Sequence, residues 1–312
     1  MRESSLQSLK GHFNLVNLGC IGDEDYATPS SIARLMTVIE VDAVGRANTQ
    51  SRYHRKIQID EPIAGVAGPR TFRKNTFAGT CSLLEPITGI VEALGMENYC
   101  QLVNRTPVQC RSLPDALRKY NLNGIDLLKT DVEGADFEII KGCGDWLGRI
   151  LCIQCELRFR PFYQGEPYFH EVVGYLFDRG YEVLDIPHID RWKYKTEHRD
   201  WQREGRAFWG DFLFVLRPEK LTKIPDMPAH EAVSKQIILA ALMGKKNYAE
   251  YILSVFRSTL PPEWIPELEQ LVRPRFPAPR CWSKMLRRYI TPLELFLKHR
   301  INRSSHVAIS QQ

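Results

Sequence analysis

Strand-length apolar runs alternate with helix-like stretches through the first two thirds of this chain. The runs occupy residues 13–19, 37–45, 125–131 and 149–159, with a further one beginning at residue 56. Residues 112–121 and 132–142 have helix-like patterns between them, the first opened by the capping sequence SLPD. Alternation of this kind predicts parallel strands joined by crossover helices.

The end of this pattern differs from its beginning. Residues 181–186 and 208–218 are both strand-like, and a polar, aromatic stretch joins them in place of a helix. Two strands without a crossover helix cannot easily run parallel, so the sheet is expected to end in an antiparallel pair. That ending resembles the sheet of S-adenosylmethionine (SAM) methyltransferases. The predicted fold class is α/β: a Rossmann-like methyltransferase fold with a mostly parallel seven-stranded sheet, an antiparallel last strand and a helical C-terminal extension.

The chain of 312 residues is long enough for one α/β domain plus an appendage. After Pro218 it reads as helices interrupted by prolines, and we place a domain boundary near residue 222. This predicts a methyltransferase domain at 1–221 and a helical, basic extension at 222–312. No run approaches the ~18–20 apolar residues that cross a bilayer, and the N-terminus has no apolar signal region. We therefore expect a cytoplasmic protein.

The net charge of +5 is unevenly distributed. From Arg217 onward 16 basic residues stand against 8 acidic ones, so the body of the chain is slightly acidic. Residues 280–303 carry seven Lys and Arg against one acid, with apolar residues at helical spacing. This segment could contact an anionic membrane surface peripherally, although packing on the catalytic domain or on a second subunit of a homo-oligomer is favoured. Nucleic acid binding is not expected, because the body is acidic and carries no known binding motif.

Cys152 and Cys155 form a CxxC sequence, a spacing found in zinc and redox sites. Both lie within an apolar strand pattern, where positions three apart point to opposite faces. Two buried thiols are therefore favoured over a metal or redox pair.

Polar residues follow the first two predicted strands, at the sheet edge where α/β proteins bind ligands. Gly19 and Gly22 permit a tight turn close to a ligand after the first strand. Glu40 and Asp42 end the next strand, where an acid can accept the hydroxyl protons of a ribose, and Glu40 is preferred. An ordinary turn and an exposed acidic loop are the alternatives.

Two further strand ends carry charge. Lys129, Asp131 and Glu133 alternate along LLKTDVEG, and this spacing directs them to one side. Glu156 ends the following strand in QCELRF, so it and Asp131 could share a substrate proton or a divalent cation. A Lys in a buried strand needs a carboxylate partner, which Asp131 or Glu156 is expected to supply. Capping of the next helix is an equally good interpretation of Glu133.

The segment LLKTDVEGADFEIIKG resembles the signature of FkbM-type SAM-dependent methyltransferases, which runs roughly LKIDVEGAE before an apolar helix ending in KG. The likeness continues through residues 155–186 and in FWGDFLFV at 208–215, and more weakly in GTCSLLEP at 79–86. It covers roughly residues 12–217.

This resemblance implies methyl transfer from SAM to a hydroxyl on a sugar, glycolipid or polyketide-like natural product, so the partner is a small-molecule or glycan acceptor. Gly19, Cys20 and Gly22 match the family's glycine-rich SAM loop, and Glu40 its ribose-binding acid. Asp131 and Glu133 fall on its characteristic acidic pair, and Glu156 on the acid of the next strand. The residues expected to bind the cofactor are Asn17, Gly19, Cys20, Gly22, Glu40, Asp42 and Asp131.

The first loop departs from the family pattern Asp-x-Gly-Ala-Asn-x-Gly. Here it reads Asn-Leu-Gly-Cys-Ile-Gly, with Asn17 in place of the acid and one residue missing. This departure motivates the alternative of a catalytically degenerate SAM-fold protein that serves as a binding or scaffold module. A nucleotide-sugar transferase using Asp23 and Asp25 as a metal-binding pair is less well supported, because it explains none of the later matches.

Transfer to a hydroxyl requires a base that takes its proton. Asp131 or Glu156 is the expected base, with Lys129 and Glu133 as further catalytic candidates. His170 is a third candidate base, although an exposed helical histidine is the favoured interpretation. No metal ligands are assigned, and assistance by a divalent metal is an alternative. Between the last two strands lie aromatic residues that could stack on a sugar or pack a long hairpin: Trp192, Tyr194, Trp201 and Trp209.

Overall fold

The structure is a computed structural model that describes residues 5–19, 28–41, 52–196 and 205–273. Contacts between residues of the chain define two compact units, Met1–Val272 and Arg273–Gln312. The second unit, apart from Arg273, lies outside the described residues, and so does the basic segment 280–303.

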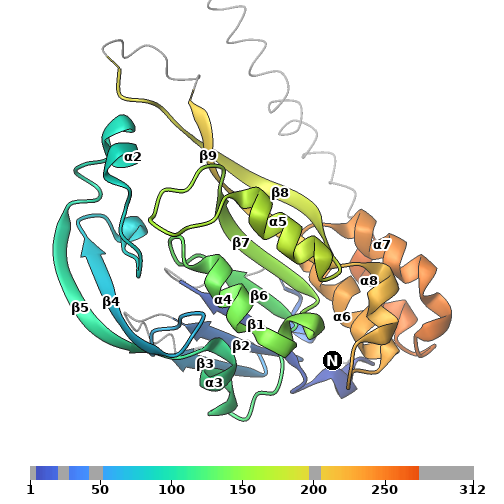
Figure 1. Ribbon diagram of the computed structural model, residues 1–312. Coiled ribbons are helices and arrows are strands. Elements are labelled where there is room, and N and C mark those ends of the chain that lie inside the picture. Colours follow the sequence, from blue (N-terminus) through green and yellow to red (C-terminus); the bar gives the residue numbers. More distant parts are fainter. Residues whose placement is uncertain (1–4, 20–27, 42–51, 197–204, 274–312) are drawn as a thin grey trace, which may run out of the picture. The chain divides into compact units, whose positions relative to one another are not determined.

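In the described part of the chain, a seven-stranded sheet organises the first unit, in the order β3–β2–β1–β6–β7–β9–β8 (Figure 1). Its strands are β1 (Phe13–Leu18), β2 (Met36–Val41), β3 (Arg55–Ile59), β6 (Leu127–Thr130), β7 (Cys152–Arg158), β8 (Tyr181–Trp192) and β9 (Arg206–Leu216). The first five in spatial order run parallel, and β9 runs antiparallel to both of its neighbours. The Rossmann-like methyltransferase fold with an antiparallel ending is thereby confirmed.

Short helices connect these strands. They are α1 (Ser30–Ala33), α2 (Thr88–Ala93), α3 (Leu113–Arg118), α4 (Asp136–Gly142) and α5 (Phe169–Asp178). Figure 1 shows α4 and α5 on one face of the sheet, over β6 and β7. The helix predicted from residue 132 begins only at Asp136, because the backbone of Glu133 and Gly134 has positive φ angles of 55° and 92°. That backbone breaks the continuity between strand and helix.

A separate antiparallel ribbon consists of β4 (Gly68–Asn75) and β5 (Leu102–Cys110). The sequence predicts short strands at 70–73 and 99–103, and the second prediction is misplaced. The amide of Cys100 donates to the carbonyl of Met96 (3.0 Å), so residues 99 and 100 belong to a turn and the strand follows them.

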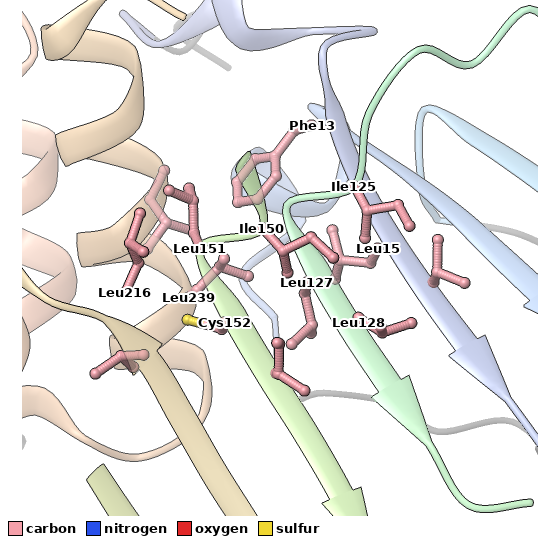
Figure 2. Packing of buried hydrophobic residues seen from close by; sticks show 14 of the residues in the cluster. Phe13, Leu15, Ile125, Leu127, Leu128, Ile150, Leu151, Cys152, Leu216 and Leu239 are labelled. Carbon is pink, nitrogen blue, oxygen red and sulfur yellow. The ribbon is translucent and has the colours of Figure 1, made fainter. Parts of the chain in front are cut away.

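One hydrophobic core joins the sheet to the helices that follow it in sequence. These helices are α6 (Ala229–Leu242), α7 (Lys246–Val255) and α8 (Ile265–Val272). Figure 2 shows Leu239 of α6 beside Leu151 and Leu216 near the start of β7 and the end of β9. Cys152 and Cys155 are both free and fully buried in this core, and burial raises the pKa of each thiol. The interpretation of the CxxC sequence as buried thiols is confirmed.

A buried ion pair fixes α6 to the sheet. Lys235 Nζ lies 3.0 Å from Asp126 Oδ1, and both side chains are almost fully buried. The amide of Asn14 in β1 donates to the other oxygen of Asp126 (2.7 Å), and Glu231 lies 2.7 Å from the ammonium. An unpaired buried charge is costly, so these contacts determine how α6 meets the starts of β1 and β6.

The change of pattern near residue 222 marks the point where helices replace strands. Because α6, α7 and α8 share the core of the sheet, they lie in the same compact unit as the strands. The division into domains at 1–221 and 222–312 stays a prediction. Among the described helices, none combines the length and the apolar character needed to span a membrane.

Candidate active site

A row of buried polar side chains crosses the sheet one position before the ends of β1, β2 and β6. Asn17 pairs in register with Glu40 on one side and with Lys129 on the other. Residues in register on parallel strands point to the same face, so the three side chains lie in one row. Their exposed fractions are 7, 7 and 9%. Polar groups so deeply buried need partners or a ligand. Pairing of Lys129 with Asp131 or Glu156 stays a prediction.

At Gly19 the chain that leaves β1 lies directly against the backbone that follows β6. Its φ of 78° is one that side chains other than glycine rarely adopt, and a Cβ built there would lie 1.8 Å from the carbonyl oxygen of Asp131. The amide of Gly19 donates to the carbonyl of Val41 (3.0 Å), and that of Asp131 to the carbonyl of Leu18 (3.1 Å). Only glycine fits here, because the backbone of Asp131 fills the space of a side chain; the predicted approach of Gly19 to a ligand stays a prediction.

Asn17 and Glu40 provide the acceptor oxygens expected of a nucleoside site. Asn17 Oδ1 is buried and has no hydrogen-bond partner among the described residues. Glu40 forms an ion pair with Lys56 of β3 at 3.0 Å, which keeps a carboxylate at the end of β2. These features fit a bound SAM, whose amino and hydroxyl groups need acceptors. Three further predicted cofactor contacts, Cys20, Gly22 and Asp42, lie outside the described residues.

The turn after β6 presents Glu133 to the interior. A Cβ on Gly134 would lie 2.7 Å from the ring of Tyr163, so the turn packs tightly beneath that ring. The hydroxyl of Ser82 donates to the carbonyl of Glu133 (2.6 Å). The carboxylate of Glu133 accepts hydrogen bonds from Arg158 (2.5 Å) and from the hydroxyl of Tyr163 (3.0 Å). Because the side chain is held by these groups and α4 starts at Asp136, the capping interpretation of Glu133 is wrong.

Three predicted site residues come together beyond β6 and β7. One carboxylate oxygen each from Asp131, Glu133 and Glu156 lies within 4.8 Å of the others. Arg158, only 5% exposed, binds Glu156 at 2.8 Å as well as Glu133. Its other terminal nitrogen lies 3.1 Å from Glu166. We call these five residues the acid cluster.

Burial gives the acid cluster an affinity for positive charge. Desolvation raises the pKa of Glu133 to about 7, against the opposing charge of Arg158. It also raises the pKa of Glu156. The neighbouring Asp136 has a pKa raised to about 6, by desolvation and then by the charge of Asp131. Such acids keep their protons to a higher pH than exposed acids do, and a nearby cation favours their ionised form. Oxygen ligands at this spacing could hold a divalent cation, and a bound sulfonium would also be favoured.

His170 lies elsewhere. It is exposed at the start of α5, and its ring lies 5.7 Å from the ring of Tyr168 and 5.9 Å from that of Phe169. These contacts agree with the favoured interpretation of an exposed helical histidine, so the structure does not bring His170 to the acid cluster.

Arg158, Tyr163 and Glu166 were not expected from the sequence. Arg158 stands two residues after Glu156 on the same strand, so alternation places both on one face. This alternation could have predicted that Arg158 lies beside Glu156. Tyr163 and Glu166 lie in the loop after β7, where the amides of Phe162 and Tyr163 donate to Glu166 (2.7 and 3.0 Å), and no periodicity predicts such a loop.

An aromatic cluster closes one side of the site. Phe162 and Tyr163 pack with Phe208 of β9 and with α2. Trp192 of β8 donates its ring N–H to the carbonyl of Leu94 (2.9 Å) and packs against this cluster. Trp192 therefore packs the hairpin, while Trp201 lies outside the described residues.

Residues 33–183 match the family of the methyltransferase FkbM domain. The chain carries an FkbM methyltransferase domain. The matched segment contains Glu40 and all five members of the acid cluster. It does not include β1, so Asn17 and Gly19 lie before it. No curated protein and no solved structure matched the chain. An FkbM domain implies a SAM-dependent methyltransferase with a small-molecule acceptor.

Proposed function

We propose that this FkbM protein is an O-methyltransferase that methylates a hydroxyl of a sugar, glycolipid or polyketide-like molecule. The observation that carries the proposal is the contact between Gly19 and Asp131, with Glu133 and Glu156 beside it. A glycine turn of the kind that can approach a cofactor thus lies against the backbone of Asp131, whose side chain belongs to a group of carboxylates that can accept a proton.

The residues at the ends of β1 and β2 are suited to hold the cofactor. Gly19 allows close approach, Asn17 offers a buried acceptor oxygen, and Glu40 lies where a ribose would place its hydroxyls. SAM, when bound, supplies a methyl group on a positively charged sulfur. The acid cluster favours that charge because its buried carboxylates outnumber the guanidinium of Arg158.

Asp131 or Glu156 would then act as the base. Either carboxylate could accept the proton of the acceptor hydroxyl while the hydroxyl oxygen is methylated. Arg158 and Tyr163 hold Glu133 and so position the turn that carries Asp131. The aromatic cluster around Phe162 and Phe208 would exclude water from one side of the reaction.

Calorimetric titration with SAM tests this proposal. The wild-type chain is expected to bind SAM at micromolar concentration, and Glu40→Gln and Asp131→Asn to weaken binding at least about tenfold, the effect of one lost charge-assisted hydrogen bond. Glu61→Gln is the matched control, since Glu61 pairs with Lys119 and Arg111 at a partly exposed position.

Wild-type protein that binds neither SAM nor S-adenosylhomocysteine would overturn the proposal. It would favour the alternative of a SAM-fold scaffold protein, for which Asn17 in place of an acid is the supporting observation. Equal weakening in all three variants would show that the site residues have no special role.

A further inference from the structure

The segment that leaves β7 connects the acid cluster to a second polar site. Arg158 points its charge into the acid cluster, whereas Arg160, two residues later, is exposed. The amide of Phe159 donates to the carbonyl of Phe208 (2.9 Å), so this segment is attached to β9 between the two arginines. One short stretch of chain thus supplies a guanidinium to each of two adjoining places.

Arg160, Tyr194 and Arg206 border a shallow cleft with an apolar floor. The floor is formed by Ile90 of α2, by Leu94 directly after that helix, and by Phe208. Arg206 Nη1 donates to the hydroxyl oxygen of Tyr194 at 2.9 Å. Arg160 lines the same cleft, and the two arginines together lower the pKa of the phenol, Arg206 most. Two guanidinium groups therefore lie around one phenol.

The charge of this cleft is opposite to that of the acid cluster. Within the described ranges, neither Arg160 nor Arg206 forms an ion pair with a carboxylate, whereas Arg158 binds three of them. Guanidinium groups are planar forks of N–H donors that match the oxygens of a phosphate or a carboxylate. An oxyanion could occupy the place where they now meet the phenol, with the hydroxyl of Tyr194 as a third donor.

We propose that Arg160, Arg206 and Tyr194 form a subsite for an oxyanion on the methyl acceptor, a phosphate ester or a carboxylate. The inference rests on the proposed methyltransferase function and narrows its substrate class to acidic small molecules. Phe208 of the apolar floor packs against Phe162 at 5.5 Å, and Phe162 against Tyr163 at 5.0 Å, so a chain of ring contacts connects the cleft to the residue that binds Glu133. An anionic group held at this rim stays apart from the carboxylates that would repel it.

Calorimetric titrations of the full chain with three probes test the subsite. The probes are glucose 6-phosphate, glucuronate and the neutral methyl glucoside. We expect the wild type to bind at least one of the two anions and to bind methyl glucoside at least about tenfold more weakly. Arg160→Gln and Arg206→Gln should each weaken anion binding about tenfold or more, as expected for a charge-assisted hydrogen bond. The stronger of the two anions identifies the phosphate or the carboxylate as the recognised group.

Arg191→Gln is the matched control, because Arg191 is exposed on the same hairpin and, among the described residues, its side chain hydrogen-bonds only to the carbonyl of Gly205. Its anion affinity should equal that of the wild type. The subsite is refuted if the wild type binds neither anion, or if Arg191→Gln weakens binding as much as the other two variants. SAM affinity, measured on the same samples, should be unchanged in all three variants. If the wild type does not bind SAM, the proposed function is overturned. The anion titrations would still show whether the cleft binds an oxyanion.

Discussion

Two buried charge clusters lie at opposite ends of β6, only four strand residues apart. Asp126 precedes the strand, and Asp131 follows it. Asp126 is matched by Lys235 and by the amide of Asn14, at 3.0 and 2.7 Å. At the other end, Glu133, Glu156 and Glu166 share the single guanidinium of Arg158, with Asp131 beside them.

The difference separates a structural role from a functional one. At the start of β6 each charge has a fixed partner, so that end serves to fasten α6. At the carboxyl end Glu133, Glu156 and Glu166 share one guanidinium, and burial raises the pKa of Glu133 and of Glu156, as it also raises that of Asp126 at the other end. Three carboxylates that share one guanidinium can accept a further proton or cation, and acids of this kind are found most often at functional sites.

The largest effect is expected at the balanced end. Lys235→Met leaves Asp126 buried without its counter-ion and should lower the free energy of unfolding by about 3–5 kcal/mol, measured by urea denaturation. Lys245→Met is the control, because its partner Asp185 is partly exposed and the loss should stay below about 1 kcal/mol. SAM affinity should be retained in both variants. If Lys235→Met is no more destabilising than Lys245→Met, the pair does not fasten α6.

Arg158→Met should have a smaller effect that depends on pH. At pH 8 the variant leaves charged acids without their guanidinium, and we expect a loss of about 2 kcal/mol in the free energy of unfolding. At pH 5 the loss should fall below about 1 kcal/mol, because acids with raised pKa values take up protons in place of the missing charge. Equal losses at the two pH values would show that the acid cluster is as balanced as the Asp126 pair.

A still smaller effect is the pH dependence of the wild type itself. Glu133 has a folded pKa of about 7 against an ordinary value of 4.5, so the folded chain binds more protons than the unfolded chain between these values. The free energy of unfolding contributed by Glu133 therefore falls as pH rises through this window, by at most about 1 kcal/mol per pH unit. Glu133→Gln should flatten this slope in urea titrations at a series of pH values. An unchanged slope would show that Glu133 ionises normally.

Much of the fold followed from local pattern. The strands around Phe13, Leu127 and Ile153 are apolar runs of the expected length, and the missing crossover helix before β9 correctly indicated an antiparallel ending. The pairing of Lys235 with Asp126 joins residues 109 positions apart, and no local pattern specifies such a contact. For the same reason the sharing of one core by the sheet and α6 was not expected.

The site was predictable where strands position its residues. Asp131 directly follows β6 and Glu156 lies near the end of its parallel neighbour β7, and the structure brings them together as expected. Glu133 was ambiguous because its inward direction depends on a positive φ that the sequence does not specify. Arg158 was missed although alternation with Glu156 indicated its face. Tyr163 comes from a loop whose course depends on packing against Gly134.

We assign the function to the carboxyl end of β6. A crystal structure with S-adenosylhomocysteine tests this assignment most directly. Electron density should place its ribose hydroxyls on Glu40, its amino acid part near Gly19 and Asn17, and its sulfur on the side of Asp131. Density for the ligand away from these residues, or none at saturating concentration, would contradict the account.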